Sequence, residues 1–178
     1  SARSTHQIAV VIPSYKVERH ILGLLTRFGP EVRRIYVIDD RCPAGSGHLV
    51  NETCQDPRVE VIFHETNTGV GGAVISGYQR ALEEEMDIVV KVDGDGQMAP
   101  ELIPLLVAPI VAGEADYTKG NRFYNPEDVR GMPTIRLFGN AGLSFLTKMS
   151  SGYWSVFDPT NGFTAIHTSA VQAMSLDK

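Results

Sequence analysis

Two carboxylates and an amide follow a short apolar segment in the middle of the chain. Asp93, Asp95 and Gln97 alternate with glycines directly after residues 87–92. Alternate residues of an extended segment project to the same side, so these three side chains can present oxygen atoms to one point, and the glycines leave room for a ligand. Proteins bind Mg²⁺ or Mn²⁺ with one or two carboxylates together with substrate phosphates. The motif therefore predicts a divalent cation site, with an acidic surface turn as the alternative.

A second pair of carboxylates, Asp39 and Asp40, ends another apolar segment. Adjacent residues of a strand point to opposite faces, so one carboxylate can accept a hydrogen bond from a ligand N–H while the other caps the following loop. The pattern leaves open which of the two has which role.

A glycine-rich turn at residues 67–73 opens a helical pattern and includes Asn67 and Gly71. Such a turn can bring backbone N–H groups close to a phosphate or a ribose. It is not a dinucleotide fingerprint, because Val74 occupies the third glycine position, and the lysine of a phosphate-binding P-loop is absent. Tight packing of the helix against its strand is the alternative explanation for the glycines.

Basic residues that can meet phosphates occur later in the chain. Arg122 follows a predicted strand and can reach the same edge of the sheet, whereas Arg130 and Arg136 are expected to be solvated. His64 and His167 are isolated in the sequence, and we expect them to be structural. The nucleophile and ligand motifs of hydrolases, metalloproteases and thiol redox proteins are absent from the sequence.

The elements that must position these residues alternate between short β-branched runs and helical spacing. Strands are expected at residues 7–12, 34–39, 59–63 and 87–92, and helices at 17–28, 48–55 and 70–84. Further on, the patterns predict helices at 100–112, 134–150 and 168–176 and strands at 115–119 and 162–167. This alternation predicts an α/β fold with a mostly parallel central sheet. Ligands of such sheets bind outside the carboxyl ends of the strands, where the polar residues above would converge.

Length and composition are those of one globular domain over residues 1–178. Of the 178 residues 43% are hydrophobic and 21% charged, and the net charge of −5 argues against a nucleic-acid binder. No apolar run approaches the roughly 20 residues that span a bilayer, and the start lacks a signal peptide, so we expect a cytoplasmic domain. The last helical pattern stops abruptly at Lys178, which suggests C-terminal truncation.

Six blocks, in this order, resemble the family 2 glycosyltransferases with a GT-A fold, in the branch that acts on polyprenyl phosphates. The blocks lie at residues 11–15, 37–40, 67–73, 93–97, 119–122 and 158–163. The resemblance implies a GT-A (Rossmann-like) three-layer α/β/α sandwich. The sequence departs from the family pattern at one point, because Lys16 and Val17 separate the tyrosine of the first block from Glu18.

The resemblance also implies roles for individual residues. Residues expected to bind the nucleotide are Pro13, Tyr15, Asp39, Asp40, Asn67, Gly71 and Asp93. Residues expected to hold the metal are Asp93, Asp95 and Gln97, and those expected to act in catalysis are Asp93, Asp95 and Arg122. Pro13 and Tyr15 would line the base pocket, and Asp40 or Asp39 would accept a hydrogen bond from the base.

The implied reaction is a metal-dependent, inverting transfer of a hexose from a UDP- or GDP-sugar, with Mg²⁺ or Mn²⁺ as cofactor. The expected acceptor is a dolichyl or undecaprenyl phosphate in cell-wall or surface glycan synthesis. A lipid phosphate is already an anion, so the reaction needs no strong general base. The alternatives are a saccharide hydroxyl acceptor and a non-catalytic nucleotide-binding module. A nucleotidyltransferase is disfavoured, because it would carry a glycine-rich, arginine-containing loop where Pro13 and Tyr15 stand.

A lipid acceptor would bring the full-length protein to the cytoplasmic face of a membrane. The sequence leaves open whether the protein is a monomer or a homo-oligomer. The apolar face of the helix expected from residue 134 can either pack in the core or lie at the membrane interface.

Overall fold

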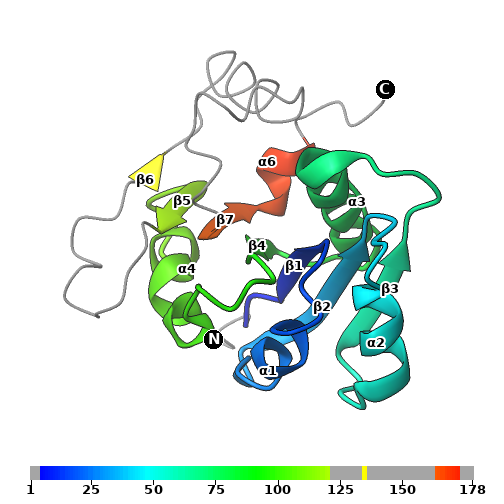
Figure 1. The fold of residues 1–178 in the computed structure, drawn as a ribbon. Coiled ribbons are helices and arrows are strands. Elements are labelled where there is room, and N and C mark those ends of the chain that lie inside the picture. Colours follow the sequence, from blue (N-terminus) through cyan, green and yellow to red (C-terminus); the bar gives the residue numbers. More distant parts are fainter. Residues whose placement is uncertain (1–4, 121–133, 136–162, 173–178) are drawn as a thin grey trace.

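The computed structural model describes residues 5–120, 134–135 and 163–172, in which one β-sheet lies between two layers of helices (Figure 1). The strands are β1 (Ile8–Ser14), β2 (Val32–Asp39), β3 (Val59–Phe63), β4 (Ile88–Lys91), β5 (Tyr117–Gly120), β6 (Thr134–Ile135) and β7 (Phe163–His167). The helices are α1 (Ile21–Leu25), α2 (Ser46–Thr53), α3 (Gly69–Glu83), α4 (Ile103–Val111) and α6 (Thr168–Gln172), and a 3₁₀ turn at Pro100–Leu102 precedes α4.

The sheet has the strand order β3-β2-β1-β4-β7-β5-β6. Strands β3, β2, β1 and β4 are parallel neighbours, so their carboxyl ends meet at one edge of the sheet. Strand β7 runs antiparallel to both β4 and β5, and β6 runs antiparallel to β5. The prediction of an α/β fold with a mostly parallel central sheet is confirmed.

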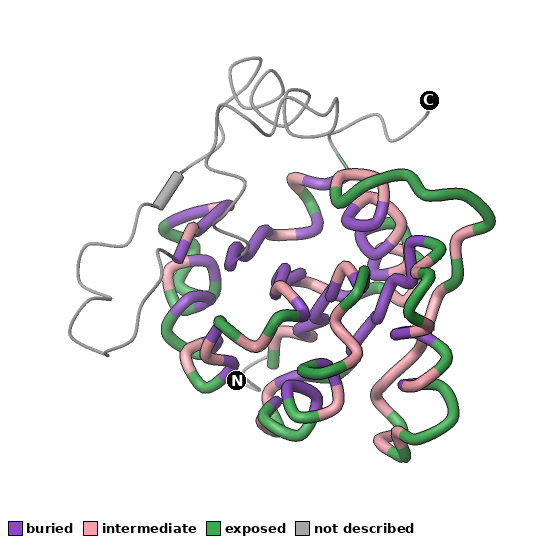
Figure 2. Tube along the Cα trace, in the orientation of Figure 1, coloured by how far each residue is buried: buried purple, intermediate pink, exposed green. Residues whose placement is uncertain are grey.

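Two hydrophobic clusters fill the two sides of the sheet and make it the middle of three layers. One cluster joins the even-numbered side chains of β1 to α1, α2 and α4, and the other joins its odd-numbered side chains to α3 and α6. Buried residues follow the central strands in Figure 2. Strand segments such as residues 8–12 are apolar throughout because both faces of these strands are covered.

Strand β1 extends two residues beyond its predicted end and includes Pro13. A proline in a central strand lacks the N–H that a ladder needs. The backbone nitrogen of Pro13 faces β4, but the pairing of β1 with β4 ends at Val11. No hydrogen bond between the two strands is therefore lost at Pro13. The extension carries the chain to the edge where the polar residues gather.

Two other predictions differ from the structure. The helix expected at residues 17–28 is only Ile21–Leu25. The helix expected at residues 134–150 is wrong at its start, because the β-branched pair Thr134–Ile135 forms β6 and pairs antiparallel with β5. Residues 136–150 lie outside the described part of the chain. Among the described residues, no helix is long and apolar enough to cross a bilayer.

Candidate functional site

A cavity of about 460 Å³ opens at the carboxyl edge of β1, β2 and β4. It is lined by segments that follow these three strands and by the start of α3. The lining residues are Pro13, Ser14, Tyr15, Val17, Asp40, Asn67, Gly69, Val70, Ala73, Asp93, Gly94 and Asp95. The structure thus brings together six of the predicted site residues: Pro13, Tyr15, Asp40, Asn67, Asp93 and Asp95.

Asp40 is held at the cavity by four hydrogen bonds from the β3–α3 connection. Its Oδ1 accepts from His64 Nδ1 at 2.8 Å, from the Thr68 N–H at 2.8 Å and from the Thr68 hydroxyl at 2.9 Å. Its Oδ2 accepts from the Gly69 N–H at 2.7 Å. Burial alone would raise the pKa of Asp40, but these hydrogen bonds outweigh it and hold the pKa below its ordinary value. The carboxylate is therefore an ionised acceptor.

Asp39 faces the opposite side of the sheet. Its Oδ1 accepts from the Cys42 N–H at 2.7 Å and its Oδ2 from the Gly47 N–H at 2.7 Å, so it braces the loop that leads into α2. A side chain at Gly47 would overlap this carboxylate, which accounts for the glycine. Asp39 is 3% exposed and does not line the cavity. Of the two adjacent carboxylates, the structure places Asp40 at the cavity and Asp39 in the loop.

The two acidic residues after β4 have different surroundings. Asp93 Oδ1 lies 3.2 Å from the Nζ atom of Lys91, a lysine that is only 4% exposed. Asp95 is exposed at the cavity, and its Oδ1 accepts from the Gln97 N–H at 3.0 Å. Gln97 is exposed and is not among the lining residues.

The carboxylates that follow β4 suit a cation whose remaining ligands are supplied by a substrate. Within residues 5–120, 134–135 and 163–172, no three Asp, Glu, His or Cys side chains gather into a metal-binding group. Asp93 and Asp95 nevertheless line one cavity, and Mg²⁺ is usually bound by one or two carboxylates plus substrate phosphates. The two carboxylates can therefore hold such an ion together with a diphosphate.

Two large apolar side chains stand exposed at the same cavity. Tyr15 is 44% exposed and Val70 is 55% exposed. The ammonium of Lys16 lies 5.3 Å from the centre of the Tyr15 ring. Exposed apolar surfaces beside an ionised acceptor are the features of a site that stacks and hydrogen-bonds a flat ring.

The remaining predicted residues lie elsewhere. Gly71 belongs to the first turn of α3 and does not line the cavity. Arg122, Arg130 and Arg136 lie outside the described residues. His167 contacts Ser169 through its ring.

Sequence reasoning missed the side chains that fix Asp40. His64 bridges Asp40 and Ser76, with its Nε2 lying 2.7 Å from the Ser76 Oγ. We expected this histidine to be structural, and no local pattern connects it to Asp40 or to Ser76 on α3. Its position directly after β3, at the ligand-binding edge of a parallel sheet, was the available signal.

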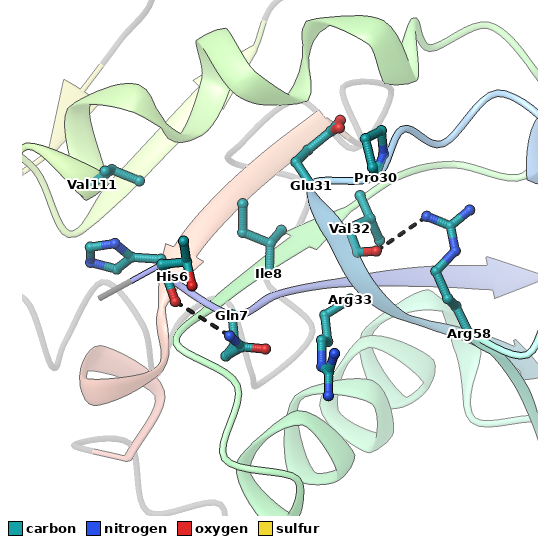
Figure 3. Close-up of a pocket in the computed structure, with 10 residues that line it drawn as sticks. His6, Gln7, Ile8, Pro30, Glu31, Val32, Arg33, Arg58 and Val111 are labelled. Carbon is teal, nitrogen blue, oxygen red and sulfur yellow. Dashed lines mark hydrogen bonds between the residues drawn. The ribbon is translucent and has the colours of Figure 1, made fainter. Parts of the chain in front are cut away.

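A second, larger hollow lies at the opposite edge of the sheet. It measures about 960 Å³ and is lined by residues that include His6, Arg33, Arg58 and Val111 (Figure 3). Arg58 donates to the carbonyls of residues 28, 29 and 32 and is paired with Asp56, so its guanidinium is used in the fold. None of the predicted site residues lines this hollow.

The cavity at the carboxyl edge thus combines two carboxylates that follow β4 with an ionised acceptor that follows β2. Residues 9–174 match the model of the family described as "Glycosyl transferase family 2". The chain therefore belongs to glycosyl transferase family 2, and the family resemblance found in the sequence is confirmed.

Relatives of known function are similar over most of the chain. It is 32% identical to the UDP-N-acetylglucosamine–dolichyl-phosphate N-acetylglucosaminyltransferase of Methanococcus voltae, over 94% of this chain and 72% of the relative. It is 30% identical to the undecaprenyl-phosphate mannosyltransferase of Micrococcus luteus, over 96% of this chain and 70% of the relative.

Solved structures share the fold at low sequence identity. Mannosyl-3-phosphoglycerate synthase from Rubrobacter xylanophilus superposes with a TM-score of 0.60 at 16% identity, over 92% of this chain and 53% of that one. A complex of glucosyl-3-phosphoglycerate synthase from Mycobacterium tuberculosis with Mn²⁺, uridine-diphosphate-glucose and phosphoglyceric acid gives 0.58 at 18% identity, over 92% and 57%. The chain thus spans little more than half the length of these two proteins. These matches confirm the predicted GT-A fold.

Proposed function

We propose that this chain is the donor-binding domain of an inverting glycosyltransferase that transfers a hexose from a nucleoside-diphosphate sugar to a polyprenyl phosphate. The observation that carries the proposal is the cavity lined both by Asp40, which follows β2, and by Asp93 and Asp95, which follow β4. Relatives about 30% identical are named for transfer to dolichyl and undecaprenyl phosphate, which supports a lipid phosphate as acceptor.

The donor would lie across the carboxyl edge, with its base near α3 and its diphosphate near the end of β4. Tyr15 and Val70 would flank the base, and Asp40 would accept a hydrogen bond from a base N–H. Asp93, oriented by the buried Lys91, would lie nearer the ribose and the diphosphate. Each role uses a side chain that already lines the cavity or fixes one that does.

A divalent cation would be held by Asp95 and Asp93 together with the donor. Such an ion neutralises the charge that develops on the leaving diphosphate and orients the donor. The complex of the mycobacterial synthase with Mn²⁺ and UDP-glucose supports this cofactor. Arg122, outside the described residues, is proposed to face the same phosphates.

The acceptor chemistry needs little from the protein. A polyprenyl phosphate is an anion at neutral pH, so its oxygen can attack the anomeric carbon without a strong general base. One displacement at that carbon inverts its configuration. We propose that the full-length protein works at the cytoplasmic face of the membrane that holds this lipid.

The test is calorimetric titration of UDP- and GDP-sugars into the chain with and without Mn²⁺. Opposite unit charges about 4 Å apart gain roughly 4 kcal/mol near a protein surface before desolvation. If desolvation leaves only about a third of this interaction energy, its loss would still weaken the binding affinity about tenfold. We therefore expect Asp95→Asn to weaken Mn²⁺-dependent binding by about tenfold or more.

The matched control is Glu114→Gln, which removes an exposed carboxylate outside the cavity and should leave binding unchanged. Binding that ignores both Mn²⁺ and the Asp95 substitution would refute the metal assignment. Transfer by the full-length protein to undecaprenyl phosphate, with the anomer identified by NMR, tests the acceptor and the inversion. Transfer only to a free saccharide would replace the lipid acceptor with a hydroxyl one.

A further inference from the structure

The four hydrogen bonds on Asp40 are unevenly divided between its two oxygens. Oδ1 receives three donors, from His64 and from the N–H and hydroxyl of Thr68, whereas Oδ2 receives only the Gly69 N–H. A carboxylate oxygen has two lone pairs. Thr68 Oγ1 also lies 3.0 Å from His64 Nδ1, so the three donors share the two lone pairs of Oδ1 and leave it no free acceptor position. Oδ2, with one donor, keeps a single acceptor position for a ligand.

His64 is locked into its place beside Oδ1. Its side chain is 13% exposed, and its two ring nitrogens lie 2.8 Å from Asp40 Oδ1 and 2.7 Å from Ser76 Oγ. Because Asp40 is ionised, the ring nitrogen that faces it acts as the donor, and the other ring nitrogen shares a hydrogen bond with the Ser76 hydroxyl. The chain Ser76–His64–Asp40 thus fixes both the orientation of the carboxylate and the number of acceptor positions that it offers.

We propose that His64, held by Ser76, is a positioning residue that makes this site select a uracil-type base, which offers one ring N–H between two carbonyls. The inference rests on the proposed donor-binding function and specifies the donor as a uridine diphosphate sugar. His64 acts through Asp40 and does not itself contact the base.

The selection follows from the hydrogen-bonding edges of the bases. Guanine presents two parallel donors, its ring N–H and its amino group, and a carboxylate pairs with both only by using both oxygens. With Oδ1 saturated, one guanine donor would lose its partner on entering the cavity, which is unfavourable. Adenine and cytosine place an unprotonated ring nitrogen beside their amino group, so a carboxylate there would face a second acceptor. The uracil imide matches the single position on Oδ2.

The apolar walls of the cavity are compatible with this choice. Tyr15 and Val70 are exposed beside Asp40 and offer flat or branched surfaces to a ring of any base. Stacking of this kind tolerates every base because each has a π-face. Discrimination is therefore assigned to the Asp40 edge, where the number of acceptors differs from base to base.

The first experiment titrates UDP, GDP, CDP and ADP into the wild-type chain with Mn²⁺. We expect UDP to bind about tenfold or more tightly than each of the others, the effect of leaving about one buried hydrogen bond unmade. GDP binding as tightly as UDP would overturn the inference while leaving the proposed function intact. Failure of all four nucleotides to bind would overturn both.

The second experiment alters the donors on Oδ1. His64→Ala removes one of the three, and His64→Ala combined with Thr68→Val leaves only a backbone N–H. The UDP-to-GDP affinity ratio should fall by about threefold in the single variant and further in the double variant, toward equal binding. A purely structural role for His64 would weaken both nucleotides equally and leave this ratio unchanged, which would refute the positioning role.

Two further variants separate positioning from folding. His64→Asn keeps a side-chain N–H near Asp40 and should restore the ratio that His64→Ala loses. His48→Ala is the matched control, because His48 is an exposed histidine that stacks on Phe63 outside the cavity. It should bind UDP and GDP as the wild type does. A ratio that His64→Asn leaves at the alanine value would also count against the proposal.

Discussion

Asp39→Asn should destabilise the fold while sparing the proposed nucleotide site. The Asp39 carboxylate is 3% exposed and accepts the N–H groups of Cys42 and Gly47, one on each oxygen, at 2.7 Å. An asparagine has a single acceptor oxygen, so one of these N–H groups would face an amino group instead. Losing one charge-assisted hydrogen bond and leaving its partner unpaired should lower the free energy of unfolding by about 2–4 kcal/mol.

Urea and thermal unfolding measure this loss. For a chain of this size it corresponds to a decrease in Tm of roughly 5–15 °C. The control is Glu52→Gln, an exposed carboxylate on α2, which should change the stability very little. UDP affinity, measured well below the Tm, should remain within about twofold of wild type for Asp39→Asn, a change of less than about 0.5 kcal/mol. A variant of unchanged stability that no longer binds UDP would show that Asp39, and not Asp40, is the base acceptor.

Two further predictions concern packing and acid stability. Gly77→Ala should lower the free energy of unfolding by about 1–3 kcal/mol in urea titrations, because the added Cβ would overlap the Val11 side chain where α3 packs on β1. The control is Gly23→Ala, where the added Cβ meets open space. This control should be neutral or slightly stabilising. The pKa of Asp40 is lower in the folded state than in the unfolded chain, so its stabilisation is present above about pH 4 and lost as the pH falls through the folded value. Asp40→Asn should therefore lose less stability than wild type on acidification from pH 6 to pH 3 in urea titrations, and equal slopes would contradict this assignment.

The central strands could be predicted within a few residues. Both faces of these strands are buried, so their sequences are apolar runs rich in β-branched residues, which are easy to recognise. The helix expected at residues 17–28 could not be placed as well, and the reason is tertiary. The N–H of Lys16 donates to Cys42 Sγ at 3.0 Å and that of Val17 to Ser46 Oγ at 3.1 Å. The β2–α2 loop and the first residue of α2 therefore hold the segment where the helix was expected to begin. Lys16 also has a φ of 56°, a conformation that no sequence pattern announces for a lysine.

The candidate site was predictable to a similar degree. Placement after parallel strands was enough to gather Pro13, Asp40 and Asp95 at one cavity. Alternation along β2 could say only that Asp39 and Asp40 face opposite sides. Which side binds a ligand depends on where α3 packs. The contact between His64 and Ser76 joins residues from two elements and carries no local signal.

In the proposed donor complex, separate elements of this fold recognise the base and the diphosphate. The groups that define the acceptor positions on Asp40 come from the β3–α3 connection and from α3, whereas Asp93 and Asp95 follow β4. A substitution near the start of α3 can therefore alter base preference without moving the carboxylates proposed to hold the metal. Among relatives named for transfer of different sugars, the residues corresponding to His64 and Thr68 should accordingly vary with the donor base, while those corresponding to Asp95 should not.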